Sequence, residues 1–281
     1  MNRPEVRQLL HQAGVRPSKR LGQNFLVDRT VVESIADWIR TESPHLVIEI
    51  GPGLGVVTEA LGRVAERVVA VELDRRLAIL VEKRFRDQGN VAVEIGDVLK
   101  FNIAEAAARR GRAIVFGSLP YRSTAPILKY LIAQRDAIET ALLITQQEVA
   151  KKLAASPGKD GTALGVLVRA YAEIEILRPI GRGSFEPSPE VESTLWALRF
   201  LDEPRFDCDA EAFFLIVRAI YGSRRKMLRR VLQQLVPASA VATVLESADI
   251  PGDVRGETLG FEDLERLARA VSVHRLKGDN G

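Results

Sequence analysis

The sequence predicts an α/β protein whose sheet is Rossmann-like and mostly parallel, and three observations support this. Strand and helix patterns alternate from residue 30 to about 145, which is typical of a parallel sheet covered by helices. An apolar run over residues 46–50 leads directly into a glycine-rich turn. A second apolar run ends in Glu72, about 20 residues after the first glycine of that turn. We therefore expect a ligand site at the carboxyl edge of the strands.

The first predicted helix and strand lead to the glycine-rich turn. Apolar residues recur at helical spacing over 31–39, and the strand at 46–50 follows. A tight turn needs backbone angles that are closed to other residues, and glycine leaves no Cβ between the chain and a ligand. The glycines are Gly51, Gly53 and Gly55. Three residues further lies Thr58, where a dinucleotide-binding turn has a small residue against the pyrophosphate. A cofactor without phosphates therefore fits better.

The second and third strands each end in an acid. Residues 67–72 end in Glu72, whose carboxylate is placed to accept both hydroxyls of a ribose. A helix pattern over 77–85 comes next. The strand at 91–95 is followed by Asp97, which is placed to accept a hydrogen from an adenine amino group. These two acids predict an adenosine-containing cofactor.

The fourth strand, 112–117, runs into Ser118-Leu119-Pro120-Tyr121. This segment resembles the Asn/Asp/Ser-x-Pro-aromatic motif of S-adenosylmethionine-dependent methyltransferases that act on exocyclic amines. A helix pattern around 128–132, a strand at 141–145, a helix at 146–153 and a loop at 156–161 follow. Two later runs, over 172–177 and 193–201, are predicted to close the sheet as an antiparallel pair at its edge.

The order of the motifs resembles the small-subunit ribosomal RNA adenine dimethyltransferases over about residues 18 to 230. A co-linear series is far more specific than one glycine motif. The matching segments are Gly22-Gln-Asn-Phe-Leu26, Glu49-Ile-Gly-Pro-Gly53, Glu72, Gly96-Asp97, Phe116-Gly-Ser-Leu-Pro-Tyr121, Phe185-Glu-Pro-Ser-Pro-Glu-Val191 and Arg224-Arg-Lys226. The resemblance implies S-adenosylmethionine as the cofactor, with Asn24 and Leu26 in contact with it, and adenine N6 in small-subunit RNA as the methyl acceptor.

The motif after the fourth strand also suits amine chemistry. An adenine N6 lone pair is delocalised into the ring, so acceptors must hold the amine hydrogens while the nitrogen pyramidalises. The Ser118 hydroxyl and the Leu119 carbonyl supply such acceptors, and Pro120 restricts the backbone of the turn. Tyr121 is placed to stack on the base. The resemblance implies that Phe185 covers the second face of a flipped base. Glu49 lies inside a buried strand, so we expect it to accept a hydrogen bond beneath the glycine turn rather than to take part in catalysis.

Composition places limits on the partners. The chain has 281 residues, 46% of them apolar, which suits one large domain and a small one. Lys and Arg number 40 against 37 Asp and Glu, so contact with a polyanion requires clustered charge. Cys208 is the only cysteine, which excludes a disulfide framework. The histidines are scattered, so no metal site is expected. A signal peptide and a membrane span are not expected either, which favours the cytoplasm.

Two stretches carry the clustered positive charge. Residues 1–20 hold five cations against one acid, and residues 218–230 hold six against none. The second stretch is predicted to bind RNA phosphates, through Arg224, Arg225, Lys226, Arg229 and Arg230. Beyond residue 207 the pattern is helical, at 213–220 and 264–271. We expect a methyltransferase domain over 1–204 with an N-terminal segment covering the cofactor, a small helical RNA-binding domain over 205–281, and a monomer.

Three departures from the family pattern leave the function open. Ser118 stands where the family usually has asparagine, and a hydroxyl reaches less far than an amide. Residues 159–165 lack the usual aromatic-Gly-x-Leu-Ser segment, and Tyr221-Gly222 replaces Phe-Asn. Besides a small-subunit adenine dimethyltransferase, two alternatives therefore remain. One is a large-subunit enzyme of the macrolide-resistance type, and the other is an RNA-binding assembly or transcription factor with impaired catalysis.

Overall fold

The computed structural model describes residues 1–18, 22–108, 110–158 and 160–274. Lys19 and Arg20 of the N-terminal basic stretch, and Lys159 of the 159–165 segment, lie outside the described residues. The chain divides into two compact units: Met1–Ala150 with Glu173–Phe200, and Lys151–Ala172 with Leu201–Gly281. The second unit thus includes residues 151–172, whereas the sequence prediction placed a single division at 204/205.

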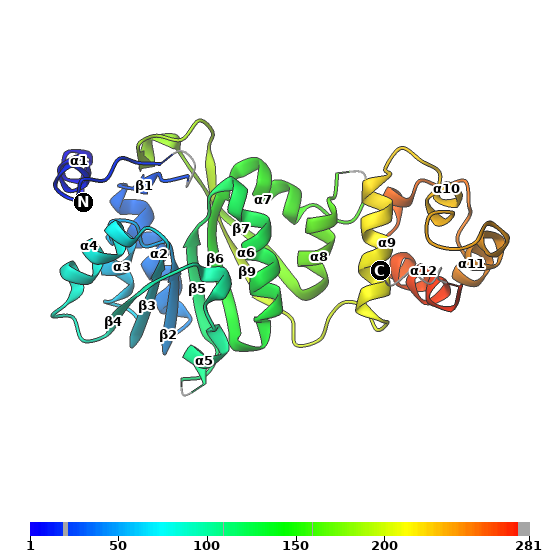
Figure 1. Cartoon of the computed structure of the whole chain (residues 1–281), viewed down its shortest axis with the longest axis horizontal. Coiled ribbons are helices and arrows are strands. Elements are labelled where there is room, and N and C mark those ends of the chain that lie inside the picture. The colour runs from blue at the N-terminus through cyan, green and yellow to red at the C-terminus, as the bar shows by residue number, and fades with distance from the viewer. Residues whose placement is uncertain (19–21, 109, 159, 275–281) are drawn as a thin grey trace. The chain divides into compact units, whose positions relative to one another are not determined.

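The first unit is built on a sheet of seven strands among the described residues, in the order β4-β3-β2-β5-β6-β9-β7. Strands β2 to β6 are paired in parallel, and β9 runs antiparallel to β6. Their bounds are β2 Leu46–Ile50, β3 Arg67–Glu72, β4 Val91–Ile95, β5 Ala113–Ser118, β6 Ile138–Gln146, β7 Ala172–Ile180 and β9 Ser193–Phe200. The predicted α/β fold with closing strands is confirmed (Figure 1).

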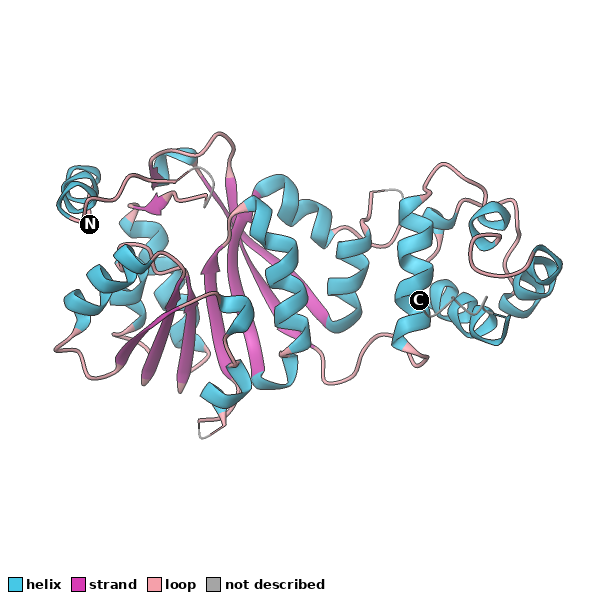
Figure 2. Cartoon of the chain, viewed as in Figure 1, coloured by secondary structure: helices cyan, strands magenta, loops and turns pink. Residues whose placement is uncertain are grey.

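The strands in the middle of the sheet are buried almost along their whole length. All five residues of β2 are buried, and so is β5 as far as Gly117. Such continuous apolar runs are expected of parallel strands that are covered on both faces. Figure 2 shows the helices of the first unit around these strands. They are α2 Arg29–Thr41, α3 Val56–Leu61, α4 Arg75–Phe85, α5 Ile103–Ala107 and α6 Tyr121–Ala133.

The predicted helices form where the apolar spacing indicates. Helix α2 begins after Asp28, whose carboxylate accepts the backbone N–H of Thr30, and it buries the predicted apolar stripe, including Ile35 and Ile39. Helix α4 begins in the same way after Asp74. Helix α7 Gln147–Ala154 follows β6, as predicted.

Three elements near the N-terminal segment are among those of the first unit that were not predicted. Helix α1, Arg3–Gln12, starts with a capping box between Asn2 and Glu5. Strands β1 Phe25–Leu26 and β8 Phe185–Glu186 pair antiparallel and form a separate two-stranded sheet. Each strand has only two residues, so neither carries a periodic pattern that a sequence could reveal.

The second unit is helical in its described part and has its own apolar core. The core includes the fully buried Phe213, Leu228 and Leu267. Its helices are α8 Ala163–Tyr171, α9 Ala210–Gly222, α10 Leu228–Leu232, α11 Val241–Ala248 and α12 Phe261–His274. Of these, α9 and α12 match the predicted patterns, while α8 was not predicted. Across the residues that the structure describes, no helix combines the length and apolar character needed to cross a membrane.

Candidate active site

Two adjoining hollows open in the described part of the first unit, at the carboxyl ends of the parallel strands. The first has a volume of about 280 Å³ and the second about 400 Å³. They share one wall, made of Gly22, Gln23, Asn24, Ser118 and Pro120. Ligand sites of open α/β sheets lie at this edge. We call them the cofactor hollow and the target hollow, after the roles predicted from the sequence.

The glycine turn forms one side of the cofactor hollow. Gly51 and Gly53 line it, with φ angles of +70° and +59°. A Cβ on Gly51 would meet no atom within 4 Å, whereas one on Gly53 would lie 2.9 Å from the Phe25 ring. Gly55, at φ +75°, instead packs against Phe85. The left-handed angles favour glycine at all three positions, and the turn exposes backbone to a ligand at Gly51.

The predicted acids lie in the same hollow. Glu72 and Asp97 both line it, and each also accepts backbone hydrogen bonds. Glu72 Oε2 accepts the N–H of Gly53 at 3.1 Å, and Oε1 accepts the N–H of Asp74 at 2.9 Å. Burial raises the pKa of Glu72. Each carboxylate oxygen retains a further lone pair, so Glu72 can hold the glycine turn and still accept ribose hydroxyls.

Of the two covering residues, the structure brings only Asn24 to the hollows. Asn24 lines both of them, and its Nδ2 donates to the Gly22 carbonyl at 3.3 Å. Leu26 lines neither hollow, because its side chain is buried in the apolar cluster that also contains Val31 and Phe185. Its neighbour Phe25 lines the cofactor hollow instead.

Beneath the glycine turn lies a buried pair, Glu49 and Thr58. Thr58 is fully buried and its hydroxyl donates to Glu49 Oε2 at 2.6 Å. Burial raises the pKa of Glu49 to about 8. The supporting role expected of Glu49 matches this geometry. Thr58 was expected to disfavour a pyrophosphate, and the structure shows that its side chain is hydrogen-bonded to Glu49 in β2.

The motif at the end of β5 lines the target hollow. Ser118, Leu119, Pro120 and Tyr121 all lie in its wall. Leu119 is anchored, because its side chain is buried and its N–H donates to the Ile144 carbonyl at 2.8 Å. Pro120 is the N-cap of α6, and Tyr121 is the first residue of that helix. The anchored turn therefore presents an exposed Ser118 to both hollows.

Two aromatic rings line the target hollow in different ways. Tyr121 is 66% exposed, whereas Phe185 is 2% exposed and packs with the apolar residues behind β1. Both lie in the wall of the same hollow. Phe185 is thus a fixed part of the wall, and Tyr121 has room to adjust to a base.

Sequence reasoning missed Gly22 and Gln23 as individual site residues. Gly22 has φ +63°, and a Cβ there would lie 2.5 Å from Pro120 Cβ. Gln23 Oε1 accepts the N–H of Ser18 at 2.8 Å. The positive φ and the close approach are invisible in a sequence, although the position of Gly22 at the start of a matching motif was a signal.

The basic stretch of the second unit differs from the sequence prediction at Arg224. The stretch contains no acid, but Glu257, distant in sequence, lies 4.0 Å from the Arg224 guanidinium. Arg224 also donates to the Gly161 carbonyl and stacks on Tyr221, whose hydroxyl accepts the N–H of Gly158. Its guanidinium therefore ties Gly161 to the segment that follows α9, and these contacts compete with RNA phosphates for the same side chain.

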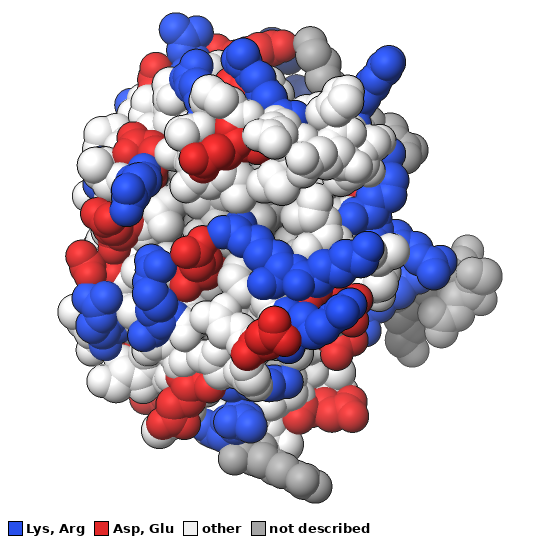
Figure 3. Space-filling model, turned by 90° about the vertical axis from the view of Figure 1, so that its left-hand side faces the viewer, with Lys and Arg blue, Asp and Glu red and all other residues white. Residues whose placement is uncertain are grey.

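The remaining predicted RNA contacts are exposed. Arg225, Lys226, Arg229 and Arg230 all reach solvent, and Arg229 Nε donates to the Gly252 carbonyl at 3.3 Å. In the first unit, by contrast, Figure 3 shows Lys and Arg interspersed with Asp and Glu on the side that carries α1 and α4. Within the described chain, no group of three or more His, Cys, Asp or Glu is arranged to hold a metal ion.

Comparison with known proteins matches nearly the whole chain. A family model described as ribosomal RNA adenine dimethylase matches residues 15–267. The ribosomal RNA small subunit methyltransferase A of Hahella chejuensis is 36% identical over 272 residues, which cover 96% of this chain and 97% of the relative. The protein of the same name from Acidobacterium capsulatum is 37% identical over 274 residues, with 95% of each chain covered.

Solved structures resemble the fold over a similar length. The 23S rRNA methyltransferase ErmE superposes with a TM-score of 0.68 at 27% identity, covering 89% of this chain and 100% of that one. A dimethyladenosine transferase from Plasmodium falciparum gives a TM-score of 0.75 at 22% identity, covering 90% of this chain and 100% of that one. At this lower identity, the second likeness concerns the fold alone.

The buried carboxyl of Glu49 predicts a pH-dependent stability. The folded protein keeps the Glu49 proton up to about pH 8, whereas the ordinary pKa is 4.5. The free energy of unfolding should therefore fall as the pH rises from 5 to 8. Glu49→Gln removes the titrating group but keeps an acceptor for Thr58, so its melting temperature should decline less over this range than that of the wild type. Thermal melts of both proteins at pH 5–9 measure the difference.

Exposed Glu94 offers the matched control. Glu94→Gln makes the same chemical change at the surface and should leave the pH profile of the melting temperature unchanged. Identical profiles for wild type and Glu49→Gln would show that Glu49 is ionised in the folded protein.

Proposed function

The chain belongs to the ribosomal RNA adenine dimethylase family, and we propose that it transfers methyl groups from S-adenosylmethionine to the N6 amine of adenines in small-subunit ribosomal RNA. Two adjacent adenines, each dimethylated, are the proposed products. The curated relatives at 36–37% identity are named for the small subunit, while the 23S enzyme is 27% identical. The large-subunit alternative is therefore not favoured.

One observation supports the transfer most directly: Ser118 lies in the wall that the two hollows share. A cofactor in one hollow and a base in the other would meet beside this residue. Transfer in a single step requires donor and acceptor to be held within contact distance, and their pre-orientation removes several kcal/mol, roughly 7–11 in favourable cases, from the barrier. Because the two hollows have lining residues in common, a donor in one and an acceptor in the other would lie next to each other.

The cofactor hollow fits the adenosine part of S-adenosylmethionine. Gly51 leaves open space beside the backbone, Glu72 supplies ribose acceptors, and Asp97 supplies an acceptor for the adenine amine. The Asp97 side chain already accepts the N–H of Leu99 at 3.0 Å, which orients it. Asn24 closes the hollow from the N-terminal segment. We infer a cofactor contact for Leu26 only through its backbone, because its side chain is buried elsewhere.

The cofactor, when bound, supplies a methyl group on a sulfonium, which is already activated for attack. The protein needs to hold the amine and stabilise its developing charge rather than supply a strong base. The Ser118 hydroxyl and the Leu119 carbonyl accept the two amine hydrogens, and the hydrogen bond from the Leu119 N–H to the Ile144 carbonyl, with the buried Leu119 side chain, keeps this residue in place. Tyr121 and Phe185 hold the two faces of the flipped base, which helps to offset an unstacking cost of a few kcal/mol.

The RNA substrate requires contacts beyond the active site. We infer that Arg225, Lys226, Arg229 and Arg230 bind phosphates, since all four are exposed and lie in one stretch. Arg224 acts mainly through its contacts with the Gly161 carbonyl and Glu257. We further infer that the protein acts as a monomer on an assembling small subunit in the cytoplasm. The single cysteine and the clustered cations support this setting.

The function is tested by incubating the protein with labelled S-adenosylmethionine and unmethylated small or large ribosomal particles. Mass spectrometry then maps the modified adenines. We expect dimethylated adenines in the small particle. Transfer to the large particle alone would contradict the proposed substrate, and cofactor binding without transfer to either particle would favour an RNA-binding factor that has lost catalysis.

Ser118 should limit the rate. Asparagine at this position places a carbonyl acceptor closer to the amine than a hydroxyl does, so Ser118→Asn should raise turnover or the ratio of dimethyl to monomethyl product. A gain of about 1 kcal/mol in the transition state corresponds to roughly fivefold in rate. Single-turnover methylation of the small particle measures it, with Ser118→Ala as the control that should be slower than wild type. An unchanged or lower rate in Ser118→Asn would show that Ser118 is not a weakened acceptor.

The basic stretch should set the salt dependence of RNA binding. Replacing Arg225 and Lys226 by glutamine should lower the slope of log affinity against log salt by roughly 2, at about 1 per lost phosphate contact. The matched control replaces Lys151 and Lys152, two exposed cations of the same unit, by glutamine. Binding of small-subunit RNA at several salt concentrations measures the slopes. Equal slopes for the two double variants would show that Arg225 and Lys226 do not bind RNA phosphates.

A further inference from the structure

Helix α1 packs against the cofactor hollow through its apolar side. Val6 is fully buried and Leu10 is 6% exposed. They form an apolar cluster with Phe25 and Leu77, two residues that line the cofactor hollow. Residues four apart lie on one side of a helix, so Val6 and Leu10 make one continuous contact. The helix thus supports one wall of the cofactor hollow from outside.

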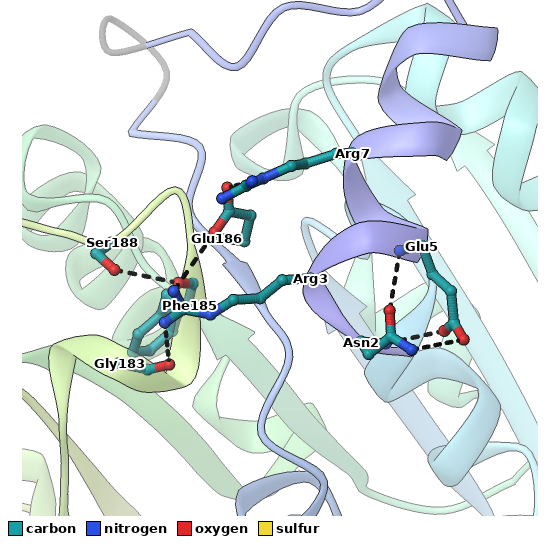
Figure 4. Close-up of polar contacts among 8 residues, drawn as sticks. All are labelled: Asn2, Arg3, Glu5, Arg7, Gly183, Phe185, Glu186 and Ser188. Atoms are coloured by element: carbon teal, nitrogen blue, oxygen red, sulfur yellow. Dashed lines mark hydrogen bonds and ion pairs between the residues drawn. The ribbon is translucent and has the colours of Figure 1, made fainter.

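The same helix contacts the segment that carries Phe185 through two arginines, which are also four residues apart. Arg3 Nη2 donates to the Gly183 carbonyl at 2.7 Å, and Arg7 Nε donates to Glu186 Oε1 at 2.8 Å. Arg3 also lies 3.9 Å from the second oxygen of Glu186. Figure 4 shows both side chains extending from α1 to the segment on either side of Phe185. Two cations from one helix therefore hold the segment 183–186.

Backbone pairing holds this segment over only two residues. Phe185 and Glu186 pair with Leu26 and Phe25, and the N–H of Val27 donates to the Ser184 carbonyl at 2.8 Å. A two-stranded pairing this short is marginal by itself. The buried Phe185 ring and the Ser184 hydroxyl, which donates to Asp28 Oδ2 at 2.8 Å, strengthen the attachment. The two arginines of α1 add contacts at the residues on either side of Phe185.

The arginine contacts of α1, unlike its apolar contacts, contribute little to stability. The Arg7 side chain is 68% exposed, and solvent screens an ion pair with so exposed a partner. The Glu186 side chain, in contrast, is 13% exposed. Arg7 lowers the pKa of this carboxyl, so it is ionised at neutral pH and the pair persists. The Arg7–Glu186 pair therefore fixes the position of the segment 183–186 more than it raises the free energy of unfolding.

We propose that Arg3 and Arg7 are positioning residues. Through them, α1 keeps the part of the target hollow formed by Phe185 in a fixed position relative to the part of the cofactor hollow formed by Phe25. The inference rests on the proposed function, because Phe185 is taken to cover the target base. Neither arginine touches a hollow directly. Their removal should misplace the base relative to the methyl donor, an error of a kind that costs roughly ten- to a hundredfold in rate.

The test compares the double variant Arg3→Ala, Arg7→Ala with wild type in methylation of the small particle and in hydrogen exchange of the protein alone. We expect kcat to fall by about tenfold or more, while KM for the particle and the melting temperature stay close to wild type. Exchange of the Val27 amide should become faster by about tenfold, because its partner at Ser184 is released. Arg40→Ala, which removes an exposed ion pair with Asp37 on α2, is the control and should change neither measurement.

Two results would overturn the proposal. The first is a double variant with wild-type kcat and wild-type exchange at Val27. The second is a loss of activity together with a lower melting temperature and faster exchange throughout the first unit, since α1 would then serve folding alone. If wild-type protein transfers no methyl group, the proposed function fails, and the exchange measurement still decides whether α1 holds the segment 183–186.

Discussion

The close approach of Gly22 to Pro120 is the steric constraint on which the site depends. A Cβ on residue 22 would lie 2.5 Å from Pro120 Cβ, nearer than unbonded carbon atoms come. Only glycine, which also tolerates the φ of +63°, lets the N-terminal segment lie on the turn at the end of β5. This contact builds the wall shared by the two hollows. It places Asn24 and Ser118 together, so the cofactor and target sites become neighbours.

Beneath this wall, buried polar groups hold the backbone that the cofactor would meet. Glu72 accepts an N–H from each side of the site, at Gly53 and Asp74, and so links the turn after β2 to the turn after β3. Glu49 receives the Thr58 hydroxyl one layer lower. Burial raises the pKa of both acids, which means that ionising them costs stability. Such a cost is common where a site needs acceptors in fixed positions.

Sequence patterns predicted the elements whose signal is local and missed those that depend on distant contacts. The parallel strands, the glycine turn and helices such as α2 and α9 follow from periodicity and capping, and all are present. The pairing of β1 with β8 joins Leu26 to Phe185 across the whole first unit, and no local pattern indicates it. The family resemblance implied that Leu26 contacts the cofactor, and the structure places its side chain in the apolar core. Arg224 was expected at RNA because its stretch contains no acid, and the structure brings Glu257 to it from a distant part of the sequence.

We propose that a methyl donor and an adenine meet at Ser118, and a crystal structure of the protein with S-adenosylhomocysteine and a small-subunit RNA fragment tests this. The thioether sulfur should face the shared wall. The adenine should lie in the target hollow, with N6 within hydrogen-bond distance of Ser118 Oγ, about 3 Å. An adenine bound with N6 directed away from Ser118, or a cofactor lying outside the hollow lined by Gly51 and Glu72, would contradict it.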